Sequence, residues 1–426
     1  METQEAPIPI MFVDEAATFG GTIVVLATLI GELDRSAFVP ILVSSMQPRI
    51  FKSLFNSNEV LIPLRCSFDY VKRARVIAFF RDINERFARL GAYAATVLGM
   101  PADIIYRRRL LKIIQRYQPA LVHISNNSHR AARVCAKLGK PFIWHLHAPS
   151  SIASPQARNE PLTRANAAIA ISNYVVHHSP DLDVIPGPRF VIPNPTRAVA
   201  KAPPEKLIAL RNKLGIGANQ PIVGIFGRLV AWKGQKEFIE AFRIVLRDCP
   251  NAVALVVGDA SDLGHEYEKE IRSLIERESL SQNVRLYGYS ADPAPLYQLC
   301  SIVVHASVEP EPFGLVIIEA MTAGSAVIAS SLGAGPEIVM HERSGLIADP
   351  RNTAELAAAI LRLMRDEELR TRLAATGQQI ASTEYSATRY ARAVENLYRT
   401  VLQPVPRRVG ARTSETAQDA DKLDAA

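Results

Sequence analysis

The chain has 426 residues, of which 48% are apolar, and a net charge of +7. A chain of this length predicts two domains, and its composition excludes a disordered or fibrous protein. The longest near-apolar window, "LGAYAATVLGM" (90–100), is much shorter than the ~20 residues that a helix needs to span a bilayer. The N-terminal residues have no basic segment followed by an apolar one, so we expect no signal peptide. The four cysteines lack CxxC or zinc-ligand spacing, which favours reduced thiols in a cytoplasmic enzyme.

The positive charge is concentrated in residues 65–116. This segment contains twelve Lys or Arg residues and four Asp or Glu residues, and the rest of the chain is nearly neutral. The global basicity is therefore one local patch, which indicates a local partner.

Short β-rich runs alternate with helical patterns along the chain, as in parallel sheets with crossover helices. In the first half we predict strands at 10–14, 40–45, 60–64, 120–125, 142–147, 168–172 and 189–194. In the second half we predict strands at 221–229, 253–259, 284–289, 302–307, 326–330 and 345–349, with helices at 234–248, 265–280, 353–381 and 386–402. The sequence therefore predicts an α/β fold with two Rossmann-like, doubly wound domains that face each other across a cleft.

The predicted boundaries follow the changes in composition. Residues 1–198 form the N-terminal domain and 199–220 a linker, since 195–220 are rich in prolines, charges and turn residues around one short helix. Residues 221–385 form the C-terminal domain. The helix at 386–403 is predicted to pack back toward the N-terminal domain, and the polar tail 404–426 to be disordered.

Two strand-to-helix loops carry residues suited to phosphates. After the first strand, Gly20 and Gly21 open a helix in "TFGGT" (18–22), where backbone amides can approach an anion; such a pair can equally be only a turn. In "FGRLVAWKG" (226–234), Arg228 and Lys233 flank a loop turn and suit a diphosphate, the alternative being two solvated charges.

"EPFGLVIIEAMTAG" (311–324) combines a loop carboxylate with a helical one. Phe313, Gly314 and Leu315 would present free amides at the helix start, and Glu319 would lie about one turn further in. Carboxylates accept hydrogen bonds from vicinal sugar hydroxyls. Glu319 could therefore hold a ribose and Glu311 a second sugar, with the phosphates between them; otherwise Glu319 is an ordinary surface charge.

The histidines do not form a predicted metal site. His145 and His147 share one face of a strand in "WHLHAPS" (144–150), but no Cys or carboxylate cluster accompanies them, so we expect no metal. The remaining histidines are interpreted as structural or surface residues: His123, His129, His177, His178, His265, His305 and His341.

A series of motifs resembles the retaining GT-B glycosyltransferases of family 4. It comprises "FGGT" (19–22), "WHLHAPS", "IAISNYV" (169–175), "VIPNP" (191–195), "GRLVAWKG" (227–234), "VVGD" (256–259), "VRLYGY" (284–289), "EPFGLVIIEAMTAG" and "GAGPEIVMHERSGLI" (333–347). The series covers residues 9–402. The resemblance implies a nucleotide-diphosphate-sugar donor held mainly by the C-terminal domain, an acceptor bound by the N-terminal domain, and no cofactor or metal.

The resemblance also implies a role for each matching residue. Glu319 would be the ribose ligand and Glu311 the carboxylate facing the donor sugar, with the amides of Phe313, Gly314 and Leu315 near sugar and phosphate. Arg228 and Lys233 would neutralise the departing diphosphate. Gly20 and Gly21 would close on it, and His147 would be the active-site histidine. Retention in the family is attributed to front-face attack by the acceptor.

Three positions depart from the family pattern. "GGTI" (20–23) stands where Gly-Gly-Ala-Glu is frequent, "NP" (194–195) where Asn-Gly is frequent, and "GAG" (333–335) where a Gly-Gly pair is frequent. These departures concern the acceptor side more than the diphosphate or ribose contacts.

The basic patch favours an anionic membrane. Arginines in 70–100 alternate with Phe79, Phe80, Phe87 and Leu90, as in basic amphipathic helices at membranes. We therefore expect peripheral contact with the inner face of the membrane, a saccharide or lipid-linked acceptor in envelope or exopolysaccharide biosynthesis, and no nucleic acid. A solvated helix face is the alternative. For the whole chain, the alternatives are a non-catalytic nucleotide-sugar-binding subunit and a GT-B nucleotide-sugar epimerase.

Overall fold

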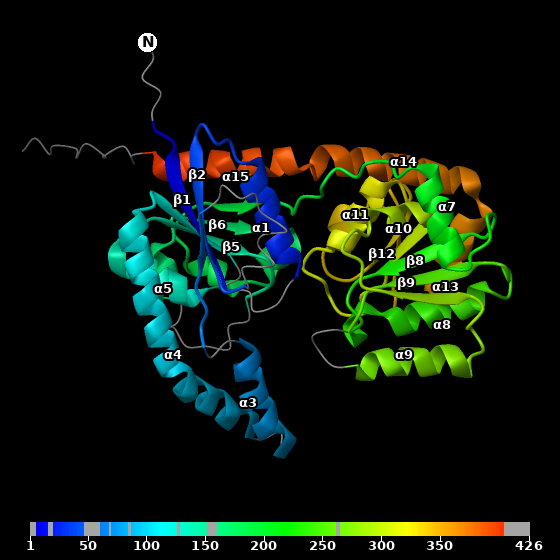
Figure 1. Cartoon of the computed structure of the whole chain (residues 1–426), viewed down its shortest axis with the longest axis horizontal. Helices are drawn as coiled ribbons and strands as arrows, with labels where there is room; N and C mark the ends of the chain where they lie inside the picture. Colours follow the sequence, from blue (N-terminus) through cyan, green and yellow to red (C-terminus); the bar gives the residue numbers. More distant parts are fainter. Residues whose placement is uncertain are drawn as a thin grey trace, which may run out of the picture.

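The computed structural model describes residues 6–15, 20–46, 60–67, 70–83, 87–125, 128–150, 160–260 and 265–403. The predicted disordered tail, 404–426, lies outside these residues. The described part of the chain forms two parallel sheets placed side by side, each covered by helices (Figure 1). This arrangement confirms the predicted α/β class with two doubly wound units.

The first sheet has the strand order β3-β2-β1-β4-β5-β6-β7 among the described residues. Its strands are β1 Ile8–Asp14, β2 Phe38–Ser44, β3 Val60–Pro63, β4 Leu121–Ser125, β5 Phe142–Leu146, β6 Ala167–Ala170 and β7 Arg189–Val191. Its helices are α1 Gly21–Glu32, α3 Tyr70–Ile83, α4 Ala88–Tyr117, α5 His129–Leu138 and α6 Asn173–His177. All pairings are parallel, because helices or short 3₁₀ turns carry most connections between neighbouring strands.

The second sheet has the order β10-β9-β8-β11-β12-β13. Its strands are β8 Ile222–Phe226, β9 Val253–Val257, β10 Val284–Gly288, β11 Ile302–His305, β12 Ala326–Ser330 and β13 Leu346–Ala348. Its helices are α7 Pro204–Lys213, α8 Gln235–Val245, α9 Glu266–Arg277, α10 Ala294–Leu299, α11 Leu315–Ala323, α12 Gly335–Ile338, α13 Thr353–Arg365 and α14 Glu367–Glu384. Each strand that we predicted in the two halves is present, with ends that differ by a few residues.

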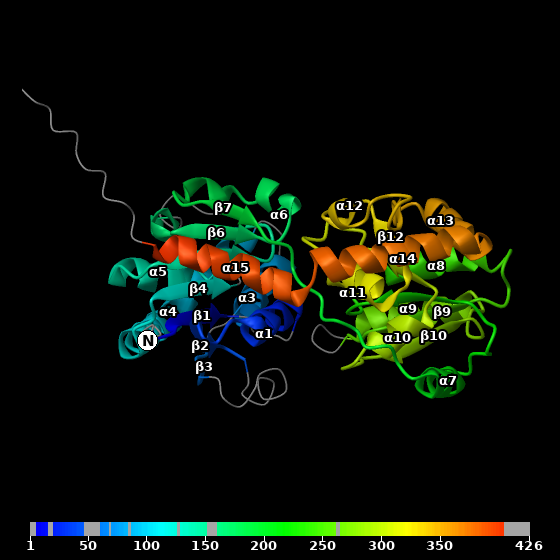
Figure 2. The same cartoon turned by 90° about the horizontal axis from the view of Figure 1, so that it is seen from above.

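The C-terminal helix α15, Ala387–Leu402, crosses from the second sheet to the first (Figures 1 and 2). It packs beside α1, and its buried residues Tyr390, Val394 and Tyr398 join the apolar core on that face of the first sheet. Because this face is covered by α1 from the start of the chain and α15 from its end, the first sheet is completed by residues that follow the second.

One predicted helix has different bounds in the structure, and the basic stretch of the first half is helical. The predicted helix 353–381 is two helices, because Asp366 ends α13 and its carboxylate then accepts a hydrogen bond from the Leu369 amide at the start of α14. The basic stretch 70–117 forms α3 and the long α4, which continues through Pro101. Among the described helices, none is both long and apolar enough to cross a membrane.

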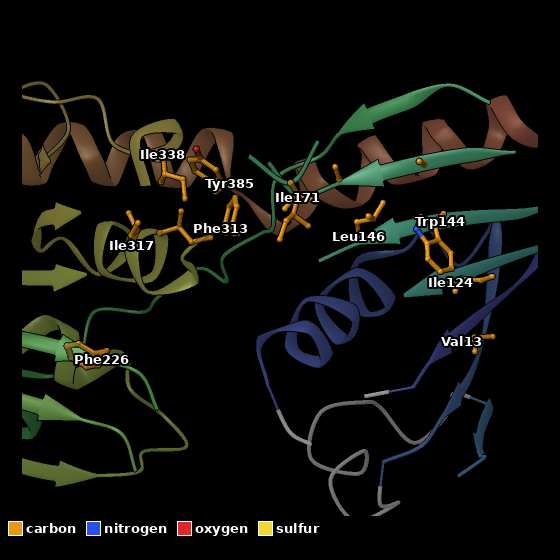
Figure 3. Close-up of a cluster of buried hydrophobic side chains, with 14 of the residues drawn as sticks. Val13, Ile124, Trp144, Leu146, Ile171, Phe226, Phe313, Ile317, Ile338 and Tyr385 are labelled. Atoms are coloured by element: carbon orange, nitrogen blue, oxygen red, sulfur yellow. The ribbon is translucent and has the colours of Figure 1, made fainter. Parts of the chain in front are cut away.

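Apolar side chains also meet where the two sheets adjoin. Figure 3 shows Phe313, Ile317, Ile338 and Tyr385 on the side of the second sheet and Ile171 on the side of the first, within one buried cluster. The Phe313 and Tyr385 rings meet edge to face, with centroids 6.1 Å apart. The start of α11 is therefore anchored by apolar packing where the two halves meet.

Candidate functional site

The predicted site residues of the second half gather where β8 and β11 end. These two strands are neighbours in the sheet, but the chain goes on from them to opposite sides of the strand order. Ligands of doubly wound sheets bind at this switch point, outside the carboxyl ends of the strands. The loop after β8 ends in a 3₁₀ turn, Ala231–Lys233, and the loop after β11 leads to α11.

Glu311 is the centre of the cluster at this point. Its Oε1 accepts a hydrogen bond from Lys233 Nζ at 2.6 Å, and its Oε2 from His305 Nε2 at 2.6 Å and Ser307 Oγ at 2.7 Å. The side chains of Lys233 and Glu311 are only 12% and 13% exposed. The ammonium also lies over the Trp232 ring, 4.5 Å from its centroid. The loop carboxylate is therefore held by three donors in a largely desolvated position.

Glu311 is ionised at neutral pH. Burial by itself would raise the pKa of the Glu311 carboxyl, but the nearby Lys233 and His305 side chains, with the hydrogen bonds that both donate, hold that pKa well below its usual range. His305 Nδ1 lies 3.4 Å from the Ser330 amide, which donates to it, and His305 Nε2 faces Glu311. The Glu311 carboxylate thus keeps its negative charge beside Lys233.

Glu319 lies on α11, about one turn after the helix begins. Its Oε2 accepts a hydrogen bond of 2.8 Å from the hydroxyl of Tyr297, whose ring stacks on Phe226 with centroids 3.8 Å apart. Burial raises the pKa of the Glu319 carboxyl, although Tyr297 and Lys233 oppose the rise. Glu319 therefore has one hydrogen-bond partner, and its negative charge is less stabilised than that of Glu311.

The start of α11 has the backbone geometry that free amides require. Gly314 precedes the helix with φ +105, in the left-handed region, and a Cβ there would lie 2.9 Å from Ile317 Cδ1. Phe313 is buried, and no side-chain oxygen caps the helix. The Ile317 amide donates to the Gly314 carbonyl at 2.9 Å, so among the described residues the amides of Leu315 and Val316 are left for a ligand or water.

The glycines after β1 are brought to the same place. Gly21 begins α1, and a Cβ added to it would lie 2.5 Å from Leu315 Cδ1, so the two helix starts touch across the two halves. Gly20 has open space around its α-carbon. The structure thereby joins Gly20, Gly21, Glu311, Lys233 and the start of α11, which are far apart in the sequence.

Arg228 and His147 are not joined to this cluster by any hydrogen bond or ion pair among the described residues. Arg228 is exposed, and only its backbone carbonyl has a partner, the Gln235 side chain at 2.9 Å. His147 follows β5 and packs its ring on His145, with centroids 4.1 Å apart. Of the two cations predicted to bind a diphosphate, Lys233 pairs with Glu311, and the role of Arg228 beside it stays a prediction.

Three residues of the cluster were missed by the sequence reasoning. His305, taken there for a structural or surface residue, is buried and bonded to Glu311, so a surface role is wrong. Ser307 and Tyr297 were not considered. The available signal was position, because His305 and Ser307 end a strand at the carboxyl edge, where both side chains can face the following loop.

Polar contacts tie the first half to the Glu311 loop. Ser172 Oγ donates to the carbonyl of Pro312 at 2.6 Å. The Glu337 carboxylate accepts hydrogen bonds from the amides of Asn173 at 2.7 Å and Tyr174 at 2.6 Å. The residue that follows Glu311 is thus fixed by a hydroxyl from the opposite half.

Two further features of the described residues bear on the site. No group of three or more His, Cys, Asp or Glu side chains there could hold a metal ion. A cavity of about 860 Å³ opens between α1, residues 196–199 and the α14–α15 junction, and none of the predicted site residues lines it.

Part of the chain is similar to known glycosyltransferases. Residues 208–380 match the glycosyl transferases group 1 family. A GDP-mannose-dependent monoacylated alpha-(1-6)-phosphatidylinositol monomannoside mannosyltransferase of Corynebacterium glutamicum is 29% identical over 43% of this chain and 49% of its own. The lipopolysaccharide core biosynthesis mannosyltransferase LpsB of Rhizobium meliloti is 26% identical over 57% of this chain and 68% of its own.

The fold is shared over nearly the whole chain. Anabaena HepE in complex with UDP superposes with a TM-score of 0.72 at 24% identity, covering 92% of this chain and all of HepE. The sucrose-phosphate synthase of Thermosynechococcus elongatus superposes with a TM-score of 0.67 at 22% identity, covering 92% of this chain and 99% of its own. The chain spans about half the length of the first curated relatives that it matches. The chain therefore has the GT-B fold, and its residues 208–380 are similar to the glycosyl transferases group 1.

Proposed function

We propose that the protein is a retaining glycosyltransferase that moves a sugar from a nucleotide-diphosphate-sugar to a saccharide or lipid-linked acceptor. The observation that carries the proposal is the placement of two carboxylates around one open helix start. Glu311 is held by Lys233, His305 and Ser307, and Glu319 by Tyr297. Between the two carboxylates, the uncapped start of α11 offers the amides of Leu315 and Val316 to an anion.

The two carboxylates differ in a way that suits two ends of one donor. Glu311, with its pKa held down, is an ionised acceptor for the hydroxyls of the donor sugar. Glu319, which already accepts one hydrogen bond, has remaining lone pairs for ribose hydroxyls. The phosphates would lie at the start of α11, with Gly20 and Gly21 of the other half above them.

Charge stabilisation is assigned to Lys233 and Arg228. Glycosyl transfer builds negative charge on the departing diphosphate, and a preorganised cation stabilises that charge without reorganisation. Lys233 is preorganised by Glu311, and Arg228 is an exposed side chain of the same loop that can reach a phosphate oxygen. This residue set supplies the required charge without a metal, and the acceptor would attack from the front face of the donor, beside His147.

The relatives define the range of donors to be tested. The Corynebacterium relative is GDP-mannose-dependent by name, and HepE was solved with UDP and with UDP-glucose. The nucleobase of this chain's donor is therefore best found by thermal-shift screening of UDP-, GDP-, ADP- and dTDP-sugars, because a tight binder raises the melting temperature by mass action. Failure of every nucleotide-sugar to stabilise the protein would contradict the proposal.

Product analysis then separates the three classes of function. A retaining transferase forms a new glycosidic bond with the donor's anomeric configuration, whereas an epimerase returns an altered nucleotide-sugar. A binding subunit gives neither transfer nor donor hydrolysis. We expect Lys233→Met to lower kcat by about 10²–10³-fold, as for loss of one charge-stabilising group. Lys236→Met, which removes an exposed lysine three residues later, should leave kcat unchanged.

The helical pair α3–α4 supports a membrane-bound acceptor. Figure 1 shows it projecting from the body of the first half. One face of α4 packs inward through Ala95, Ala102, Tyr106, Leu110 and Ile114. The opposite face carries an exposed apolar stripe at helical spacing, formed by Leu90, Tyr93, Val97, Met100 and Ile104.

This stripe continues directly into positive charge. Arg108, Arg109, Lys112 and Arg116 are exposed on the last turns of α4. An apolar stripe of roughly 20 Å beside cationic side chains is typical of a surface that inserts into the interface of an anionic membrane. Phe79 of α3 is exposed as well, at 64%. We therefore propose that α3–α4 bind the inner face of the membrane, where a lipid-linked acceptor would reside.

Vesicle binding tests this part of the proposal. Neutralising Arg107, Arg108 and Arg109 should weaken binding to vesicles that contain anionic lipid, and Val97→Ser with Met100→Ser should weaken it at high salt too, where charge is screened. Ile208→Ser, at an exposed apolar residue of α7, is the matched control and should have no effect. Unchanged binding of both α4 variants would refute membrane contact without affecting donor binding.

A further inference from the structure

A line of hydrogen-bonded rings runs through the first half from the C-terminal helix toward His147. His123 of β4 and His145 of β5 lie on neighbouring strands. Tyr398 of α15 donates to or accepts from His123 Nδ1 at 2.7 Å, and His123 Nε2 lies 2.9 Å from His145 Nδ1. All three side chains are buried, with exposures of 0–2%. Three polar groups in a core require a reason beyond packing.

Each ring in the line is fixed by its neighbours. Phe12 and Phe38 meet the Tyr398 ring edge to face, with centroids 6.4 Å and 5.7 Å away. Phe12 also lies against His123, at 5.3 Å. The hydroxyl of Tyr398 therefore has one position, and through it the ring of His123 has one orientation.

His147 is held differently. Its Nδ1 is buried and has no hydrogen-bond partner among the described residues. The contact that orients its ring is the His145 ring, 4.1 Å away and tilted by 33°. Because no hydrogen bond from the described residues fixes His147, the angle of its ring depends on the angle of His145, which His123 and Tyr398 determine.

We propose that Tyr398 and His123 are positioning residues, which hold His145 and through it set the orientation of His147. This inference rests on the proposed role of His147 beside the donor. It assigns a function to α15, which crosses from the donor-binding half to cover the first sheet: the helix delivers the hydroxyl that anchors the line.

The line acts through orientation and not through charge at neutral pH. Burial lowers the pKa of His123 and of His147 to about 3, and that of His145 well below its ordinary value. The three imidazoles are therefore neutral, and each carries one ring proton. On His123 and His145 the position of that proton is tied to the hydrogen bonds of the line. A change at Tyr398 should alter these proton positions as well as the ring angles.

The chain provides a matched control on the same helix. Tyr390 of α15 is also buried in the apolar core, but its hydroxyl has no hydrogen-bond partner among the described residues. Tyr398→Phe and Tyr390→Phe thus remove the same atom from similar surroundings, and only the first breaks the line.

The experiment compares these two variants in the full chain. For Tyr398→Phe we expect kcat to fall about tenfold with donor KM and donor Kd unchanged, and the ring-nitrogen NMR signals of His145 and His147 to move. Tyr390→Phe should change neither. The inference is overturned if the two variants have equal kcat, or if the His147 signals stay in place in Tyr398→Phe. If the wild type transfers no sugar, the proposed function fails, and the NMR signals still decide whether the line orients His147.

Discussion

The Lys233–Glu311 pair allows a quantitative test by a double-mutant cycle. Lys233→Met removes the ammonium with little change in length, and Glu311→Gln removes the charge of the carboxylate with little change in shape. The two side chains are 12% and 13% exposed and 2.6 Å apart. Breaking such a buried pair by removing one partner typically costs about 3–5 kcal/mol.

The structure predicts that the two single variants differ. In Lys233→Met, Glu311 keeps the donors His305 and Ser307, so we expect a loss of about 1–3 kcal/mol in the free energy of unfolding. In Glu311→Gln, the ammonium keeps a neutral amide oxygen and the Trp232 ring, so we expect about 3–5 kcal/mol. The double variant, which leaves no unpaired charge, should lose less than the sum of the two.

Urea unfolding at pH 7.5 and fixed salt, without nucleotide, measures all four proteins. The slopes of the unfolding curves must agree for the midpoints to be compared. A coupling energy of about 2 kcal/mol or more supports a desolvated pair. A coupling energy below about 0.5 kcal/mol, as for exposed pairs, would refute the burial of these charges and with it the preorganisation of Lys233.

Three further outcomes follow from the site. The folded-state pKa of Glu311 lies below the ordinary 4.5, so the stability that the ionised Glu311 contributes is complete above pH 4.5 and is lost as the pH falls below it. The unfolding free energies of wild type and Glu311→Gln should therefore converge as the pH falls below 4.5. Tyr297→Phe should lower the unfolding free energy by about 1–2 kcal/mol and weaken nucleotide binding in calorimetry; an unchanged affinity would separate Tyr297 from the ribose site. Gly314→Ala, at φ +105, should destabilise the protein by about 1–3 kcal/mol. Gly31→Ala, in open space inside α1, should stabilise it by about 0.5–1 kcal/mol. If thermal unfolding shows the same shift in melting temperature for both variants, the conformation of Gly314 is contradicted.

Much of the fold could be predicted because its signals are local. Buried parallel strands are continuous apolar runs, and both sheets have many of them separated by helical patterns. The site loops could be located for the same reason, since a strand's carboxyl end is visible in the sequence. Gly20 and the 311–319 stretch were therefore placed correctly at strand-to-helix turns.

The pairings inside the site depend on long-range geometry and could not be predicted. Lys233 and Glu311 belong to loops after strands that become neighbours only in the folded sheet, so nothing local indicates their ion pair. In the sequence, nothing distinguishes His305 from other histidines at the ends of strands. Only in the fold does the loop after β11 bring Glu311 within hydrogen-bond distance of it. The break at Asp366 had a local signal, an Asp followed by two Glu, as at a helix start.

The most direct test of the donor assignment is calorimetric. The free nucleoside diphosphate and the nucleotide-sugar are titrated into wild type, Glu319→Ala and Glu311→Gln, with the nucleotide that stabilises the protein most. We predict that Glu319→Ala weakens both ligands by a similar factor, about 10–100-fold. Glu311→Gln should weaken the nucleotide-sugar by a larger factor than the diphosphate, which it affects only through Lys233. Equal weakening of both ligands by Glu311→Gln, or none by Glu319→Ala, would contradict the assignment of the two carboxylates to the two ends of one donor.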